Sequence, residues 1–205
     1  METNYLTFEQ VRLIFIVYAS SILPLAMITY LKLNNLISSS IIKYYILIFL
    51  LCAFGWEIWF TYGIIDGFPV DLRRSDVLNW YIPKNINWIL NSLADAGTIT
   101  FGGLYLTWYL LGKKNNMISS WSWSAFALLM FLFLFQNIIV ELFLYQDQLA
   151  VGKTISWAPL SPLSSFYNPH LFDFNGRSVF LQTQLPWIFM TPLVYYFFIK
   201  LVNKN

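Results

Sequence analysis

The stretch WSWSAFALLMFLFLFQNIIVELFLY, residues 121–145, contains a single charged side chain, Glu141. A helix needs about 20 predominantly apolar residues to cross the hydrocarbon core of a bilayer. Residues 121–145 meet that length, whereas a transmembrane strand would appear as an alternating segment of about 10 residues. The stretch therefore predicts an α-helix that spans a membrane.

Four further stretches meet the same test, namely residues 11–31, 44–65, 86–111 and 183–202. Together the five stretches predict an all-α fold: a polytopic integral membrane protein built as a bundle of five transmembrane helices. The composition agrees, because 58% of the residues are hydrophobic and only 11% are charged, against about 25% charged residues in a soluble domain. The length of 205 residues fits one domain, residues 1–205.

The connection between the fourth and fifth helices, residues 146–182, is the longest and is rich in proline, serine and aromatic residues. Such a segment is too apolar for a flexible linker, so we expect it to fold back as a cap over one face of the bundle. Within it, Arg177 is expected to pair with Asp173 or with the polar head of a ligand.

Five crossings place the two chain ends on opposite sides of the membrane, which we name face A, on the side of the N-terminus, and face B. The 12 Lys and Arg residues of the chain divide equally between the two faces. However, the short loops lie on face B, which carries no acidic residue, and short loops dominate the bias of basic residues toward the cytoplasm. The charge pattern therefore predicts an N-terminus outside and a cytoplasmic C-terminus.

Three acidic residues, Glu57, Asp95 and Glu141, lie inside the predicted spans. Because an ionisable group in a bilayer costs a few kcal/mol, such groups usually face the interior of a bundle. At 1.5 Å per residue, Glu57 and Asp95 lie at nearly equal depth, roughly 12–14 Å below face A, and Glu141 is shallower. Two facing carboxylates in a low dielectric cannot both ionise easily. Glu57 and Asp95 are therefore the predicted catalytic pair, one a neutral acid and the other a carboxylate base.

Other polar side chains gather in the same half of the membrane. Asn91, Asp95 and Thr98 share one helix face by their spacing, and the face-B half is comparatively bare. This asymmetry predicts one polar pocket, open toward face A and walled by the second to fifth helices. The alternative is that these groups only hydrogen-bond one helix to another. The residues predicted to bind a ligand are Trp59, Tyr62, Asn91, Gln136, Asn137, Glu141, Gln184 and Trp187.

The sequence lacks the residues that several kinds of site require. The chain has one histidine, His170, and one cysteine, Cys52, so we predict no metal site and no cofactor. No lysine lies in the middle of a predicted helix to carry a Schiff base, no phosphate-binding glycine loop is present, and a net charge of +2 does not indicate nucleic acid. Gly102 and Gly103 are expected to allow close helix packing.

Four motifs in order resemble segments of the emopamil-binding-protein (EXPERA) family. They are Glu57-Ile58-Trp59-Phe60 with Tyr62, then Asp95 with Gly103 and Trp108, then Asn137 with Glu141, and last Gln184-Leu185-Pro186-Trp187 with Pro192. The resemblance implies a five-helix bundle with a sterol- or lipid-sized pocket, in which acids stabilise a cationic intermediate or ligand. One departure is Ala53, which stands where sterol-isomerising members have a histidine.

The leading expectation is a membrane protein that binds an apolar molecule of sterol, isoprenoid or lipid type. The residues leave open whether the pocket only binds this molecule or also isomerises it by proton transfer. Two alternatives remain: a small non-catalytic subunit of a larger membrane complex, and a proton-coupled carrier. The expected partners are membrane lipid, an apolar small molecule, and either a second copy of the chain or other chains of a membrane complex.

Overall fold

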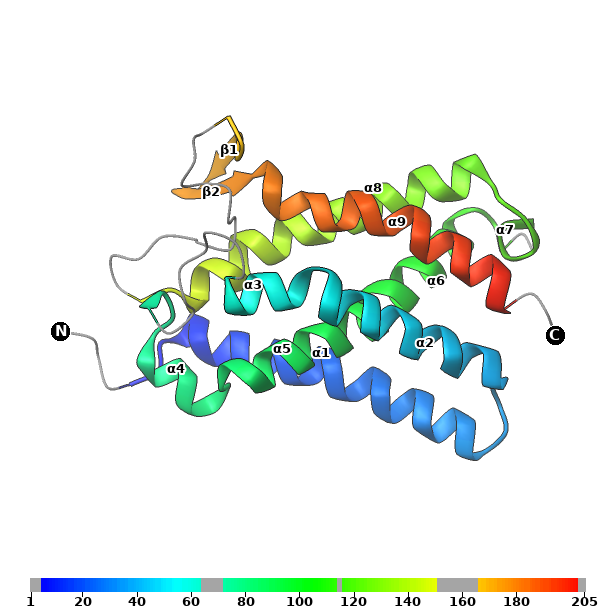
Figure 1. Cartoon of the computed structure of the whole chain (residues 1–205), viewed down its shortest axis with the longest axis horizontal. Coiled ribbons are helices and arrows are strands. Elements are labelled where there is room, and N and C mark those ends of the chain that lie inside the picture. The colour runs from blue at the N-terminus through cyan, green and yellow to red at the C-terminus, as the bar shows by residue number, and fades with distance from the viewer. Residues whose placement is uncertain (1–4, 64–71, 114–115, 151–165, 203–205) are drawn as a thin grey trace.

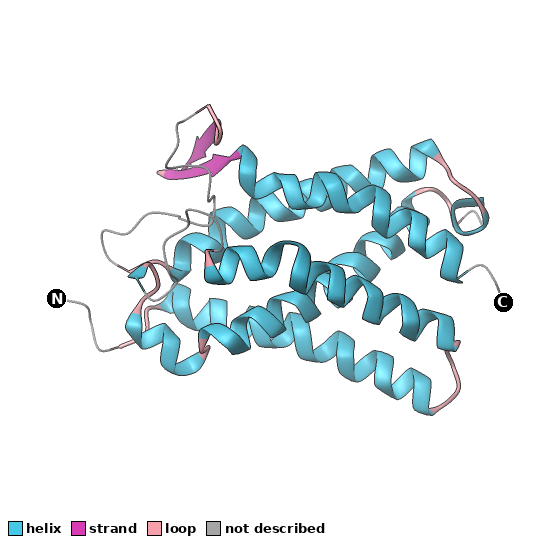
Figure 2. Cartoon of the chain, in the orientation of Figure 1, coloured by secondary structure: helices cyan, strands magenta, loops and turns pink. Residues whose placement is uncertain are grey.

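The computed structural model describes residues 5–63, 72–113, 116–150 and 166–202, which are mainly helical (Figures 1 and 2). The α-helices are α1 (Phe8–Leu33), α2 (Ser39–Cys52), α3 (Ile58–Tyr62), α4 (Asp76–Tyr81), α5 (Lys84–Ala94), α6 (Thr100–Leu110), α7 (Asn116–Ser119), α8 (Trp123–Val140) and α9 (Leu181–Val202). Three π-helical turns, η1 (Ala53–Glu57), η3 (Asp95–Ile99) and η4 (Glu141–Tyr145), interrupt longer helices, and a short 3₁₀ turn, η5 (Gln146–Gln148), follows η4.

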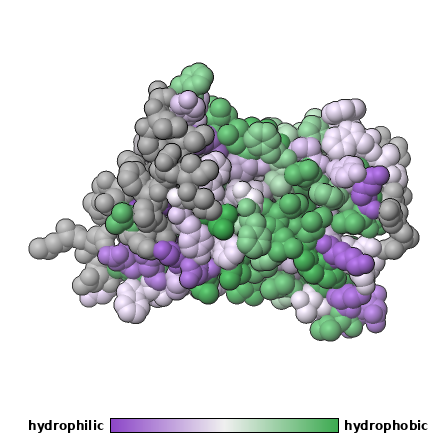
Figure 3. Space-filling model, viewed as in Figure 1, coloured by the Kyte–Doolittle hydropathy of each residue, from purple (hydrophilic) through white to green (hydrophobic). Residues whose placement is uncertain are grey.

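Four continuous helices are long and apolar enough to cross a membrane: Phe8–Leu33, Ser39–Tyr62, Trp123–Gln148 and Leu181–Val202. On the face shown in Figure 3, hydrophobic residues gather across the middle and hydrophilic residues lie toward the two ends. These features are those of a multi-pass helical membrane protein. The run Lys84–Leu110 is continuous through α5, η3 and α6, but its asparagines, glycines and Asp95 make it less apolar than the other four.

Helix α1 begins earlier than expected because of a capping box. The Thr7 side chain accepts a hydrogen bond from the Gln10 backbone N–H, and the Gln10 side chain accepts one from the Thr7 N–H. Such reciprocal bonds satisfy donors that the first turn of a helix leaves free. The helix therefore begins at Phe8 rather than at Val11, with its first turn reaching toward face A.

Helix α1 packs against α5 and η3 at a close crossing. Pro24 lies inside α1 and has no N–H to bond the carbonyl of Ser20 four residues earlier. The Thr98 hydroxyl of η3 donates to that carbonyl at 2.6 Å. The backbones come so near that a Cβ added to Gly97 would lie 2.6 Å from Pro24 Cβ. Gly97, Pro24 and Thr98 thus join α1 to η3.

Gly103 allows a second close approach. A Cβ on Gly103 would collide with the buried ring of Phe133 on α8, whereas a Cβ on Gly102 would meet no atom within 4 Å. Of the glycine pair in the sequence, only Gly103 has the expected packing role. The same region holds the main apolar core, where the Phe133 ring also packs on Trp187 of α9 at 4.6 Å between centroids.

The expectation of an all-α chain is incomplete, because two strands precede α9. Strands β1 (His170–Phe174) and β2 (Arg177–Phe180) pair antiparallel. Their turn residues Asn175 and Gly176 have φ of 50° and 73°, the positive values that a two-residue hairpin turn requires. The predicted cap depends mainly on residues 151–165, which lie outside the described residues.

Candidate functional site

In the described part of the chain, each of the three π-helical turns contains one of the three acids that were predicted to lie within the spans. Glu57 ends η1, Asp95 begins η3 and Glu141 begins η4. A π turn inserts one residue into an α-helix, so it changes which side chains face a neighbouring helix, and such turns are frequent at functional sites. The coincidence of all three turns with the three acids marks this level of the bundle as the candidate site.

Glu57 and Asp95 line one cavity of about 170 Å³. Of the predicted ligand-binding residues, Asn91, Gln136, Asn137 and Trp187 line it as well. Most of the remaining wall is apolar and includes Leu13, Ile16, Val17, Ala94, Ile99, Val140 and Leu144. The structure thus brings the two predicted catalytic acids to one mainly apolar cavity.

Each of these two acids accepts one hydrogen bond from another described side chain. Asn91 Nδ2 donates to Glu57 Oε2 at 3.2 Å, and Trp56 Nε1 donates to Asp95 Oδ2 at 3.1 Å. A carboxylate has about four acceptor positions. Both acids therefore keep capacity to bond a polar group of a ligand or water, although Glu57 is only 2% exposed.

Glu141 has a different environment. Its carboxylate accepts from the Phe180 N–H at 3.1 Å, from Thr183 Oγ1 at 2.9 Å and from Gln184 Nε2 at 2.5 Å. Gln184 Oε1 in turn accepts from Asn137 Nδ2 at 2.8 Å. These groups lie at the N-terminus of α9, where backbone and side-chain donors are available to a carboxylate. Glu141 and Gln184 lie outside the lining of the cavity, and their contacts join α8 to α9.

The predicted aromatic wall is only partly present. Trp187 lines the cavity and packs against Trp56 at 5.4 Å between ring centroids. Trp59 and Tyr62 lie outside the lining: the Trp59 ring stacks on Phe60, and the Tyr62 hydroxyl donates to Asn85 Oδ1 at 2.8 Å at an exposed position. The structure therefore does not bring these two aromatics together with Glu57 and Asp95 around the cavity.

The sequence reasoning missed three contributions to the site. The pocket was expected to be walled by the second to fifth helices, yet α1 also provides Leu13, Ile16, Val17 and Ser20. Tyr145 also lines the cavity. Its position eight residues after Asn137 could have indicated that the two side chains share one helix face. Trp56 orients Asp95 through its indole N–H, and its position next to Glu57 did not reveal that bond. For the apolar side chains of α1, nothing in the sequence distinguishes a residue that lines a cavity from one that packs in an ordinary helix contact.

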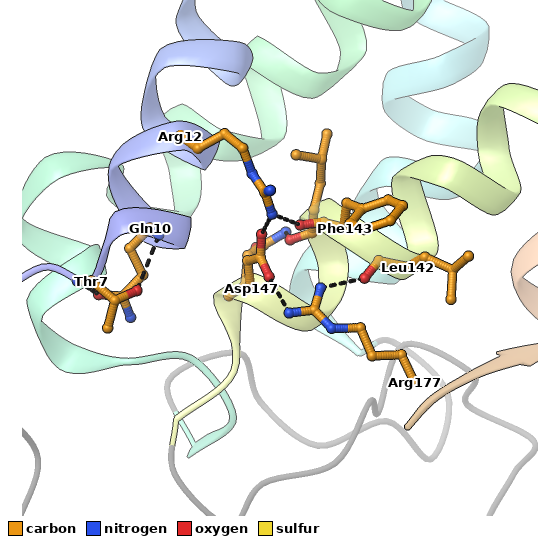
Figure 4. Close-up of polar contacts among 9 residues, drawn as sticks. Thr7, Gln10, Arg12, Leu142, Phe143, Asp147 and Arg177 are labelled. Carbon is orange, nitrogen blue, oxygen red and sulfur yellow. Dashed lines mark hydrogen bonds and ion pairs between the residues drawn. The ribbon is translucent and has the colours of Figure 1, made fainter. Parts of the chain in front are cut away.

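A charged cluster lies beside the cavity at the end of the bundle where α1 begins (Figure 4). The Asp147 side chain is fully buried and pairs with Arg12 of α1 and, at 2.8 Å, with Arg177 of β2. Arg177 also donates to the Leu142 carbonyl. The expected pairing of Arg177 with Asp173 is thus wrong. The cluster holds α1, η5 and β2 together, directly next in sequence to the cavity residues Leu13 and Gln148.

Asp173 instead bonds within the hairpin. His170 Nε2 lies 3.0 Å and Ser178 Oγ 2.7 Å from Asp173 Oδ1. The Ser178 hydroxyl and then the His170 ring hold the pKa of Asp173 below its ordinary value of 3.8. These exposed contacts belong to the hairpin rather than to the cavity.

No family model, no curated protein and no solved structure matches this chain, so the resemblance to the emopamil-binding-protein family has no support from these comparisons.

Proposed function

We propose that this protein binds an apolar molecule of sterol, isoprenoid or lipid type inside the membrane and exchanges a proton with it through Glu57 and Asp95. The observation that carries the proposal is the shared cavity, in which two acids with spare acceptor positions face a mainly apolar wall. Acids inside a bilayer are costly and usually functional. Glu141 provides the contrast, because its surrounding donors explain its presence without a ligand.

The proposal includes five crossings, with the start of α1 outside and the end of α9 in the cytoplasm. The start of α1 and the end of α9 lie at opposite ends of the bundle (Figure 1), and only an odd number of crossings separates them. The run Lys84–Leu110 supplies the fifth crossing beside the four more apolar helices. A reporter fused after α9 should lie in the cytoplasm, and a reporter found outside would reverse the orientation.

The size of the cavity limits what it can enclose. A cavity of about 150 Å³ accommodates a benzene ring, so about 170 Å³ holds one ring or a few isoprenoid carbons. The rest of a longer ligand needs a way out toward lipid. The cavity is lined on different sides by α1 and α8. The main neighbours of α1 are α5 and η3 and those of α8 are α9 and α6, which favours an exit between α1 and α8.

The chemistry follows from a neutral acid and a carboxylate at one site. The neutral acid of the pair donates a proton to one carbon of a ligand double bond, which leaves a carbocation on the other carbon. The carboxylate then removes a proton from the adjacent carbon, so the double bond moves by one position and both acids exchange roles. The low dielectric around the pair strengthens the interaction of the carboxylate with the cation, and the Trp187 ring of the wall adds cation–π attraction.

Photolabelling tests the binding step. An isoprenoid alcohol carrying a diazirine should label the purified protein saturably, and the unmodified alcohol should compete. Ala94→Phe fills the cavity, because Ala94 lines it, and should lose the label. Ala127→Phe makes the same change at an exposed position of α8 and should retain it.

Equal labelling of the two phenylalanine variants would refute the cavity as the binding site. The acids are tested by Glu57→Gln and Asp95→Asn, each of which should weaken labelling or abolish conversion of the probe to a double-bond isomer. If both variants bind and convert the probe as the parent protein does, the proton-exchange proposal fails. Purification only with fixed partner chains, and without labelling, would instead favour the role of a subunit in a membrane complex.

A further inference from the structure

A second, smaller cavity adjoins the first and shares its most polar wall. It measures about 20 Å³ and is lined by Glu57 and Asn91, which also line the larger cavity, and by Thr61 and Asn87. Gln148 lines both cavities too. A space of this size holds about one water molecule, provided that the water finds two to four polar partners. The polar residues of the wall can supply such partners.

The smaller cavity lies on the face-A side of Glu57. Thr61 follows Glu57 by one helical turn in the helix that runs toward face A, and Asn87 precedes Asn91 by one turn in the helix that starts there (Figure 1). Asn87, Asn91 and Asp95 follow one another at intervals of four residues, so they form a polar line along one side of the helix. Glu57 thus lies between a water-sized space and the ligand cavity.

The segment that contains Arg73 and Ser75 bonds to the wall of the smaller cavity. The Ser75 N–H donates to the carbonyl of Gln148 at 3.0 Å, and Arg73 donates to the carbonyl of Phe60, another residue of the wall. On the other side, beyond Asp95 toward face B, the helices enter the apolar core around Leu104, Leu129 and Phe133. The polar line therefore has an outer end near face A and an inner end at Asp95.

We propose that water reaches Glu57 from face A through the smaller cavity, so that this half-channel supplies and removes the protons that the site exchanges. The inference rests on the proposed proton exchange at Glu57 and Asp95, because it names the source of the protons. A water route that ends at Glu57, which lines both cavities, would leave the membrane closed to protons overall. It would also keep the larger cavity free of water for an apolar ligand. Protons from the aqueous side would then restore the protonation state of Glu57.

The route can be tested by the reaction of cysteine thiols with silver ions, which are small and enter only where water does. The native Cys52 is fully buried and is replaced by alanine. In that background Glu57→Cys should react with silver ions added in water, measured as loss of later labelling by a maleimide after denaturation. Ser92→Cys, at a fully buried position of the same helix as Asn87, should stay unreactive.

A larger side chain in the smaller cavity tests whether water reaches Glu57 through it. Asn87→Leu fills the smaller cavity and should abolish the silver reaction of Glu57→Cys, whereas Asn85→Leu makes the same change at an exposed position and should leave the reaction unchanged. Thr61→Cys, which keeps Glu57, should behave in the same way if Glu57→Cys does not fold. The proposal is overturned if both cysteines react no faster than Ser92→Cys, or if Asn87→Leu leaves their reaction intact. Because no ligand is added, failure of photolabelling would not alter this result.

Discussion

Gly97 offers the sharpest test of how α1 closes the site, because the backbone of η3 touches α1 there. Replacing Gly97 by alanine would put a Cβ 2.6 Å from Pro24 Cβ and 3.1 Å from Pro24 Cγ, against 3.4–4 Å for an ordinary contact. Pro24 is part of a rigid ring inside α1, so it cannot rotate away. Alanine at this position therefore requires α1 to move outward by nearly 1 Å.

The energetic cost follows from two effects. Overpacking a well-packed contact typically costs about 1–3 kcal/mol. Outward movement of α1 also lengthens the 2.6 Å hydrogen bond from Thr98 Oγ1 to the Ser20 carbonyl, and such interhelical bonds are worth about 0.6 kcal/mol on average in membranes. Gly97→Ala should therefore lower the free energy of unfolding by about 2–3 kcal/mol relative to alanine at an unobstructed helical glycine.

Gly102→Ala is that control, since a Cβ there meets no atom within 4 Å and alanine favours a helix by about 0.5–1 kcal/mol over glycine. Both variants can be unfolded by titration with sodium dodecyl sulfate in mixed micelles and followed by tryptophan fluorescence. Gly97→Ala should unfold at a lower detergent fraction than the parent protein and Gly102→Ala at an equal or higher one. If Gly97→Ala proves as stable as Gly102→Ala, the close crossing of α1 and η3 is wrong.

Three further changes have distinct expected outcomes. Thr98→Val leaves the Ser20 carbonyl without its side-chain donor and should cost about 0.6–1.7 kcal/mol in the same titration, whereas Thr98→Ser should cost little. Glu141→Gln should lower stability by about 1–3 kcal/mol, because one amide oxygen cannot serve all its donors, while photolabelling by the isoprenoid probe persists; loss of labelling with full stability would contradict the structural role. Because the folded-state pKa of Asp173 is lowered from 3.8, its stabilisation of the hairpin is present above that value and is lost as the pH falls through the lowered pKa. Carboxyl chemical shifts measured by NMR should show this, and titration at 3.8 or above would refute the Ser178 contact.

The helices were largely predictable because the lipid environment makes long apolar stretches a strong signal. Residues 121–145 and 183–202 fall inside helices at nearly the predicted bounds. The ends depend on local chemistry that was also in the sequence but was not used. Thr7 and Gln10 have the spacing of a capping box, and Asn175-Gly176 between alternating residues is a strong hairpin signal.

The candidate site was only partly predictable, and the reason is the π turns. Helical periodicity assigned Asn137 and Glu141 to one face, and both bond to Thr183 and Gln184 at the start of α9. Only Asn137 also lines the cavity, because the π turn begins at Glu141. A π turn depends on hydrogen bonds five residues apart, and residue type alone does not reveal it. Likewise, the pairing of Arg12 with Asp147 depends on how α1 lies against η5, a contact between distant parts of the chain.

The three acids raise the question of why only two are proposed to function. All three sit at π turns and are largely withdrawn from solvent, so neither of these features separates them. The number of hydrogen-bond donors around each acid distinguishes Glu141 from Glu57 and Asp95. Glu141 is surrounded by a backbone N–H, a hydroxyl and an amide, so neighbouring residues already satisfy its hydrogen-bonding capacity and its role is structural.

Among the described residues, Glu57 and Asp95 have one side-chain donor each, which is too little to stabilise two charges in a low dielectric. In the proposed function, these acids therefore depend on bonding what enters the cavity. A group in that condition changes protonation when its surroundings change, which is what proton exchange requires. Supplying the missing donors should therefore suppress function while raising stability. Ala94→Ser, which places a hydroxyl in the same cavity wall, should raise the detergent fraction needed for unfolding and weaken conversion of the probe; a fall in stability would show that the two acids are already satisfied.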